Sequence, residues 1–192
     1  MTFGIPLVIH SIVMATIIEK LESKVNPDPE LLFNYLQIFT LMMILFMAVF
    51  LGWFWSVAIG LQRLIPSNLK LNVNKFKVFL LIPAVYILLF LAYFMTAFTA
   101  GNPVLGMFFI IIPLHLFSMF CLFYCLYFVA KTIKIAELKR QVSFGDFAGE
   151  FFLIWFYPVG IWIVQPKINA MMKEIEDNTD DNLNINQHLK SF

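Results

Sequence analysis

Charged residues are scarce in this chain and are absent from three long stretches of it. Asp, Glu, Lys and Arg make up 13% of the 192 residues and hydrophobic residues 61%, whereas a typical soluble domain is roughly 25% charged. The charge-free stretches cover residues 31–62, 78–130 and 151–166. Because such segments are favoured in lipid rather than in water, the sequence indicates an integral membrane protein.

The usual signatures of enzymes and cofactor sites are also missing. The chain has no P-loop, no H-E-x-x-H zinc motif, no G-x-S-x-G elbow and no dinucleotide-binding fingerprint. Of its three histidines, His10, His115 and His188, only His115 lies within one of the membrane spans predicted below, which leaves a bis-histidine haem without a second ligand. We therefore predict no metal and no cofactor. An enzyme is not favoured, and nothing points to nucleic acid as a partner.

The lengths of the charge-free stretches predict how often the chain crosses the bilayer. About 20 helical residues cross a hydrocarbon core of about 30 Å. The first stretch predicts one span over 35–61. The second is too long for one crossing and contains the turn formers 99–103, so it predicts a helical hairpin with spans over 76–98 and 104–130.

The last stretch gives the weakest predicted span. Its apolar run reaches only about 21 Å as a helix, so a full span over 147–165 has to include Glu150. Pro158 removes a backbone donor and Gly160 loosens the helix two residues later, which favours a kink or a re-entrant turn as the alternative. We predict a straight fourth helix and keep the re-entrant turn beside it.

The predicted fold is an all-α polytopic membrane bundle of four helices with an N-terminal interfacial amphipathic helix. Residues 1–30 hold that helix and a linker, because apolar residues recur at helical spacing over 7–25. A cleaved signal peptide and a short fifth span over 3–18 are the alternatives. Residues 31–169 form the transmembrane domain, and the polar, acidic tail 170–192 is predicted to be disordered.

Basic residues predict the orientation of the chain, since short cytoplasmic loops carry an excess of them. Two predicted loops each hold four, namely Arg63, Lys70, Lys75 and Lys77 in the first, and Lys131, Lys134, Lys139 and Arg140 in the second. We therefore expect loops 63–77 and 131–145 to be cytoplasmic and both termini to lie outside, in a bacterial inner membrane. A re-entrant last segment would return the tail to the cytoplasm.

Four small residues, Ala48, Gly52, Ser56 and Gly60, follow one another at intervals of four on the first predicted span. Residues at this spacing share a helix face, and small side chains let a second helix backbone approach closely in lipid. The partner of this face is either another helix of the same bundle or a second protein. A homo-oligomer and a complex with another membrane subunit are both compatible with it.

Polar residues share a face on the third predicted span, namely His115, Ser118, Cys121 and Cys125. No fourth ligand accompanies the imidazole and the two thiols, so we interpret the cysteines as small buried hydrophobes and His115 as a hydrogen-bonding partner of a neighbouring helix. The spacing of the two cysteines on one helix also predicts no structural disulfide.

Asp146 and Glu150 stand four residues apart at the start of the fourth predicted span. Ser143 or Asp146 can cap the free N–H groups of that helix. Glu150 lies further in, where an ionisable group is costly and is a candidate for proton or cation handling. A salt bridge to Arg63, Lys139 or Arg140 is the structural alternative.

The segment WFYPVGIWIVQPKIN at residues 155–169 resembles one in small, uncharacterised bacterial multi-spanning membrane proteins. The resemblance implies a recurring membrane module and no activity. We expect a structural or accessory subunit of a membrane assembly that packs through the small-residue face. The alternative is a small ion- or proton-coupled transporter or channel that uses Glu150 and His115 beside the helix break at Pro158 and Gly160.

Overall fold

The computed structural model describes residues 11–12, 15–16, 18–19, 29–100, 105–157 and 159–173. These residues form helices and connecting turns, with no strand among them, so the predicted all-α class is confirmed. The described residues between 11 and 19 are helical. The rest of the predicted N-terminal helix, Pro158 and the tail beyond residue 173 lie outside the described residues.

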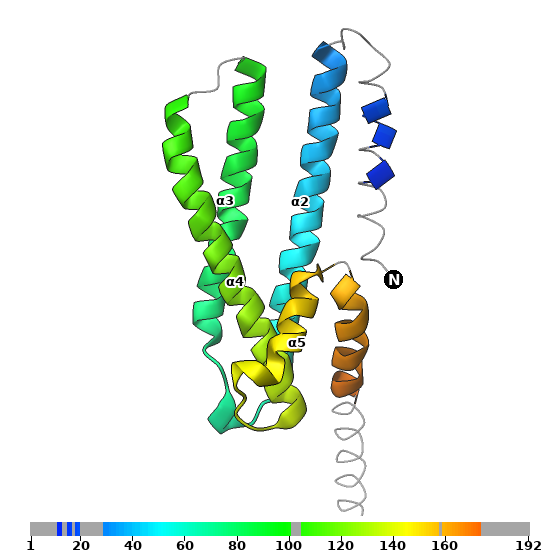
Figure 1. Ribbon diagram of the computed structural model, residues 1–192, viewed down its shortest axis with the longest axis vertical. Helices are drawn as coiled ribbons and strands as arrows, with labels where there is room; N and C mark the ends of the chain where they lie inside the picture. The colour runs from blue at the N-terminus through cyan, green and yellow to red at the C-terminus, as the bar shows by residue number, and fades with distance from the viewer. Residues whose placement is uncertain are drawn as a thin grey trace, which may run out of the picture. The chain divides into compact units, whose positions relative to one another are not determined.

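Three long helices dominate the chain. They are α2 (Pro29–Gly60), α3 (Val73–Ala100) and α4 (Phe108–Leu138), and the short 3-10 helix η3 (Leu105–Met107) precedes α4 (Figure 1). Among the described residues, three helical stretches are long and apolar enough to cross a membrane, namely Phe33–Arg63, which runs three residues beyond α2, Val73–Ala97 and Phe108–Leu138. The first three predicted spans are thereby matched by three helices, and their apolar length indicates a membrane protein.

The chain divides into two compact units. The first comprises residues 1–54 and 75–125, and therefore most of α2, α3 and α4. Its apolar side chains are widely exposed, and Phe109 keeps 85% of its surface free. Such exposure is costly in water and is normal where lipid surrounds a helix. Aromatic contact between helices occurs at Phe79 and Tyr124, whose ring centroids lie 4.5 Å apart.

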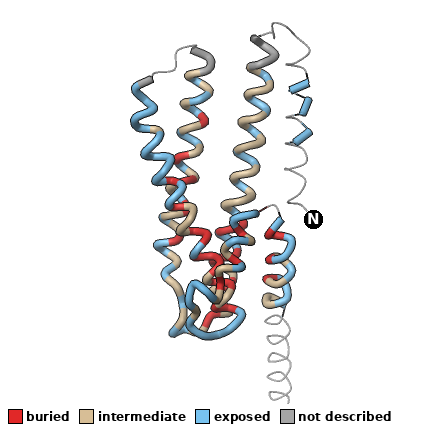
Figure 2. The backbone as a smooth tube through the Cα atoms, in the orientation of Figure 1, coloured by how far each residue is buried: buried red, intermediate tan, exposed pale blue. Residues whose placement is uncertain are grey.

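The second unit comprises residues 55–74 and 126–192. It holds the end of α2, the 3-10 helices η1 (Leu61–Arg63) and η2 (Ser67–Leu69), the end of α4, α5 (Phe144–Trp155), and a further helical segment over 159–173. Its core is apolar and fully buried, as Figure 2 shows along α4 and α5. The largest of these side chains are Leu61, Val129, Ile133, Phe147, Ile154 and Val164.

The end of α4 is fixed by Lys139. This residue has a φ of 53°, in the left-handed region where helices commonly stop, and its N–H still bonds the Ile135 carbonyl at 2.8 Å. Its ammonium group donates to the Leu64 carbonyl at 2.8 Å. The side chain therefore ties the end of α4 to the turn that follows η1.

The predicted straight fourth helix over 147–165 is wrong, because the backbone helix stops in the middle of it. α5 ends at Trp155, and Phe156 leaves helical geometry with φ −84° and ψ 49°. A new helical turn begins at once, because the Phe156 carbonyl accepts from the N–H groups of Val159 and Gly160 at 3.0 and 2.9 Å. The chain has reversed by then, since Gly160 lies against the backbone of Leu153 and Lys167 returns to Glu150. We call α5 and residues 159–173 together the helical hairpin.

Two residues explain the reversal. A proline at position 158 has no N–H to bond the carbonyl four residues earlier, so a continuous helix would lose a hydrogen bond there. Gly160 then lies against the backbone of Leu153, at a position where a Cβ would overlap main-chain atoms. Only glycine permits this approach. The predicted helix break is therefore present, since α5 ends at Trp155 and Gly160 begins the return beside Leu153.

Candidate functional site

Four charged side chains of the second unit form a closed ring of ion pairs, which we call the ion-pair cluster. Its members are Lys134 and Glu137 from α4, Glu150 from α5, and Lys167 from the returning segment 159–173. Lys134 Nζ lies 3.1 Å from both Glu137 Oε2 and Glu150 Oε1. Lys167 Nζ lies 2.7 Å from Glu137 Oε2 and 2.9 Å from Glu150 Oε1.

Local helix geometry and the hairpin together place these groups. Lys134 and Glu137 are three residues apart on α4 and therefore share a face. Glu150 lies two turns into α5, and the reversal at Phe156 brings Lys167 back beside it although 17 residues separate the two. The cluster therefore forms only when the hairpin is folded against α4.

The charges of the cluster balance, which explains how Glu150 can be only 9% exposed. An isolated carboxylate is costly to bury, whereas one that accepts hydrogen bonds from two ammonium groups is compensated. Burial by itself lowers the pKa of Lys167, but the hydrogen bonds to Glu137 and Glu150 outweigh burial and raise that pKa above its ordinary value. Lys167 therefore stays charged at neutral pH and holds the hairpin closed.

The sequence predicted the wrong partners for Glu150. The predicted cations were Arg63, Lys139 and Arg140. In the structure, Glu150 instead pairs with Lys134 and Lys167. Lys134 lies on α4, in the part of this helix that follows its charge-free residues and ends at Leu138. Lys167 becomes a neighbour only through the reversal of the chain, so the helix break beside it was the available signal.

Asp146 has a different role from Glu150. Its Oδ2 accepts hydrogen bonds from the backbone N–H and the hydroxyl of Ser143 at 2.8 and 2.9 Å, and its Oδ1 lies 3.1 Å from a guanidinium nitrogen of Arg140. These bonds, the one from the Ser143 backbone first, lower the pKa of Asp146 below its usual value. The predicted cap by Ser143 and Asp146 is thus present as a capping box at the start of α5.

The polar face of α4 lies in the first unit. Ser118, Cys121 and Cys125 are buried, and both thiols are free. His115 is exposed, and its Nδ1 lies 3.0 Å from the Tyr86 hydroxyl on α3. The interpretation of His115 as a hydrogen-bonding partner of a neighbouring helix is confirmed.

No group of three or more His, Cys, Asp or Glu side chains suited to a metal occurs among the described residues. His115 and Glu150, which the transporter hypothesis combines, belong to different compact units. Each has its own hydrogen-bonding partners: Tyr86 for the imidazole of His115, and Lys134 and Lys167 for the carboxylate of Glu150.

The small residues of α2 face outward. Ala48, Gly52 and Ser56 are exposed and Gly60 is half-buried. A Cβ built on Gly52 or on Gly60 would meet no heavy atom within 4 Å. The described part of the chain therefore leaves this stripe uncovered, which does not favour packing inside the bundle as its purpose.

No protein-family model, curated protein or solved structure matches this chain. The resemblance of residues 155–169 to bacterial membrane proteins stays a prediction from the sequence. What the protein does therefore rests on the geometry of its described helices.

Proposed function

We propose that the protein is a structural or accessory subunit of a membrane assembly, which associates through the small-residue stripe of α2 with a second copy or with another membrane subunit. The observation that carries the proposal is the exposure of Ala48, Gly52 and Ser56 together with the empty space around Gly52. Helices associate in lipid mainly by close backbone packing, because lipid tails offer no hydrophobic driving force. An uncovered groove of small residues meets that requirement.

A size increase in the groove tests the proposal. Ala48→Leu and Gly52→Leu should fill the groove and disperse the complex, whereas wild type should keep it after extraction in a mild detergent. Ala92→Leu on α3 is the matched control, since Ala92 is also exposed but lies outside the stripe. Native mass spectrometry reports the assembly. An unchanged mass for both groove variants, or dispersal by the control as well, contradicts the proposal.

The same proposal includes a topology with three spans and a re-entrant hairpin in a bacterial cell membrane. α5 has 12 residues and so reaches about 18 Å, roughly half of the bilayer. The residues around the bend are exposed and apolar, namely Phe152, Trp155, Phe156, Val159, Trp162 and Ile163. A hairpin with an apolar tip and the ion-pair cluster at its base suits insertion from the side of the basic loops 63–77 and 131–145.

A small ion- or proton-coupled transporter that uses Glu150 and His115 is the alternative function. Its support is the burial of Glu150, because an ionisable group near the membrane is a candidate for proton or cation handling. Two lysines already compensate this carboxylate, which gives the structural role more support. Proton or cation flux into proteoliposomes that falls in Glu150→Gln would favour the transporter.

A further inference from the structure

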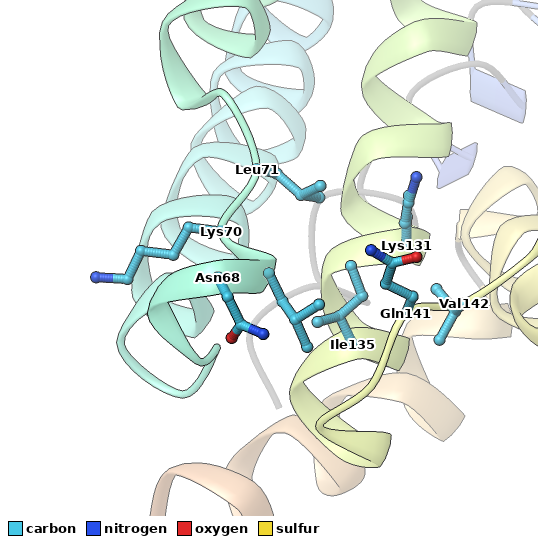
Figure 3. A pocket seen from close by; sticks show the side chains of 8 residues that line it. Asn68, Lys70, Leu71, Lys131, Ile135, Gln141 and Val142 are labelled. Carbon is cyan, nitrogen blue, oxygen red and sulfur yellow. The ribbon is translucent and has the colours of Figure 1, made fainter.

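A pocket of about 280 Å³ opens in the second unit, between η2 with the residues that follow it and the end of α4. One wall is formed by Asn68, Leu69, Lys70 and Leu71, and the other by Lys131, Ile135, Gln141 and Val142. Figure 3 shows the side chains of Leu71 and Ile135 directed into the space between the walls. The pocket therefore has an apolar floor with polar groups around it.

Every polar side chain that lines the pocket can donate a hydrogen bond. Lys131 supplies an ammonium group, and Asn68 and Gln141 supply amides from opposite walls, while Lys70 points away from the pocket (Figure 3). No acidic side chain is among the lining residues that the structure describes. This set favours an anion with several oxygen acceptors, such as a phosphate group.

The position of the pocket along the chain places it at a membrane boundary. Residues 68–71 connect the candidate spans Phe33–Arg63 and Val73–Ala97, and Lys131 lies near the end of the candidate span Phe108–Leu138. Lipid headgroups occupy this level of a bilayer. Lys131, which lines the pocket, also runs beside Tyr127, with its Nζ 5.6 Å from the ring centroid, so the aromatic ring attracts the ammonium group.

We propose that this pocket binds the phosphate of an anionic phospholipid headgroup. Lys131 pairs with the phosphate charge, and the amides of Asn68 and Gln141 bind phosphate oxygens or the hydroxyl groups of a glycerol headgroup. Leu71 and Ile135 contact the lipid carbon atoms that adjoin the phosphate. In ordinary anchoring by basic loops, every lysine near the lipid would contribute. Here Lys70, which points away from the pocket, takes no part.

Lipid retention tests the site. The full chain, reconstituted in bilayers with equal parts of phosphatidylglycerol and phosphatidylcholine and then extracted mildly, should retain phosphatidylglycerol in native mass spectra. Lys131→Gln should lower that retention roughly fivefold, as expected for one lysine near anionic lipid. Asn68→Leu, a change on an exposed turn, should lower retention less and keeps the test valid if Lys131→Gln proves unstable.

The matched control is Lys70→Gln, which removes the same charge from the opposite wall, from a side chain that points away from the pocket (Figure 3). It should retain phosphatidylglycerol as wild type does. Equal losses in Lys70→Gln and Lys131→Gln, or equal retention of both lipids by wild type, would overturn the proposal. Soluble glycerol phosphate should not displace the lipid. Displacement at matched concentration would show that the pocket binds a free phosphate compound rather than a lipid headgroup.

Discussion

Gly160 shows at the scale of one residue why the chain can reverse. A Cβ at this position overlaps the backbone of Leu153, whereas a Cβ at Gly149 in α5 would meet no heavy atom within 4 Å. We expect Gly160→Ala to lower the free energy of unfolding by about 1–3 kcal/mol, as overpacking does. Gly149→Ala should raise it by about 0.5–1 kcal/mol, because alanine favours a helix. Denaturant unfolding of the second unit in detergent measures both, and equal stability of the two variants would contradict the hairpin bend.

Asp146 gives the second prediction at this scale, which concerns pH. Hydrogen bonds from Ser143 and Arg140 lower the pKa of Asp146 in the folded state below its ordinary value of 3.8. The ionised carboxylate therefore stabilises the folded state above pH 3.8, and this contribution is lost as the pH falls through the folded-state pKa. Asp146→Asn can still accept the Ser143 bond but cannot titrate.

The measurement is the unfolding midpoint of wild type minus that of Asp146→Asn, followed as the pH is lowered. The difference should shrink below the ordinary carboxyl pKa, because only wild type loses its charged cap. Subtraction removes the titration of Glu137 and Glu150, which both proteins share. A difference that stays constant over the acidic range would show that the cap carries no charge-dependent stability.

At the residue scale, the sequence predicted roles better than partners. The Ser143–Asp146 cap depends on residues three apart and followed from local spacing. For His115 the sequence predicted a hydrogen bond to a neighbouring helix, but it did not identify Tyr86 as the partner. The environment of Glu150 depends on Lys167, which is distant in sequence. Local patterns do not contain that information, because the bend that joins the two residues is a property of the packed chain.

At the scale of elements, the ion-pair cluster joins α4, α5 and the segment 159–173 into one substructure. Glu150→Gln leaves two lysines to share Glu137. Breaking a buried pair costs about 3–5 kcal/mol, but these lysines are partly exposed, so we expect a loss of about 1–3 kcal/mol. Lys167→Gln should cost a similar amount.

The double variant separates a cluster from independent charges. Because Glu150 and Lys167 contact each other directly, the loss in the Glu150→Gln, Lys167→Gln protein should be smaller than the sum of the single losses. Lys173→Gln removes an exposed lysine from the same helical segment and should change the unfolding free energy little. Strict additivity in a double-mutant cycle would show that the two side chains do not interact.

The helices themselves were predicted unequally well. Charge-free length converts directly into spans, so α2, α3 and α4 could be anticipated from composition. Their exact ends could not, because α4 stops after Leu138, where Lys139 takes a left-handed conformation that its residue type does not predict. The last segment contained both a proline and a glycine, yet its length alone was compatible with either a kinked span or a hairpin.

At the scale of the whole molecule, the topology that we propose depends on the hairpin. A continuous fourth span would place the chain after residue 165 across the membrane from the basic loops. The reversal at Phe156 instead returns Lys167 to the end of α4, beside Lys134. The proposed topology of three spans and a re-entrant hairpin would therefore put the end of the described chain on the same side as loops 63–77 and 131–145.

Single cysteines test this topology in a chain whose buried Cys121 and Cys125 are replaced by alanine. Ser67→Cys and Lys173→Cys should react with a membrane-impermeant maleimide from the same side of sealed vesicles, since both positions are exposed. Gly106→Cys, exposed before the start of α4, should react only from the other side, because a full span separates it from Lys131. Labelling of Lys173→Cys from the side of Gly106→Cys would establish four spans and reject the re-entrant hairpin.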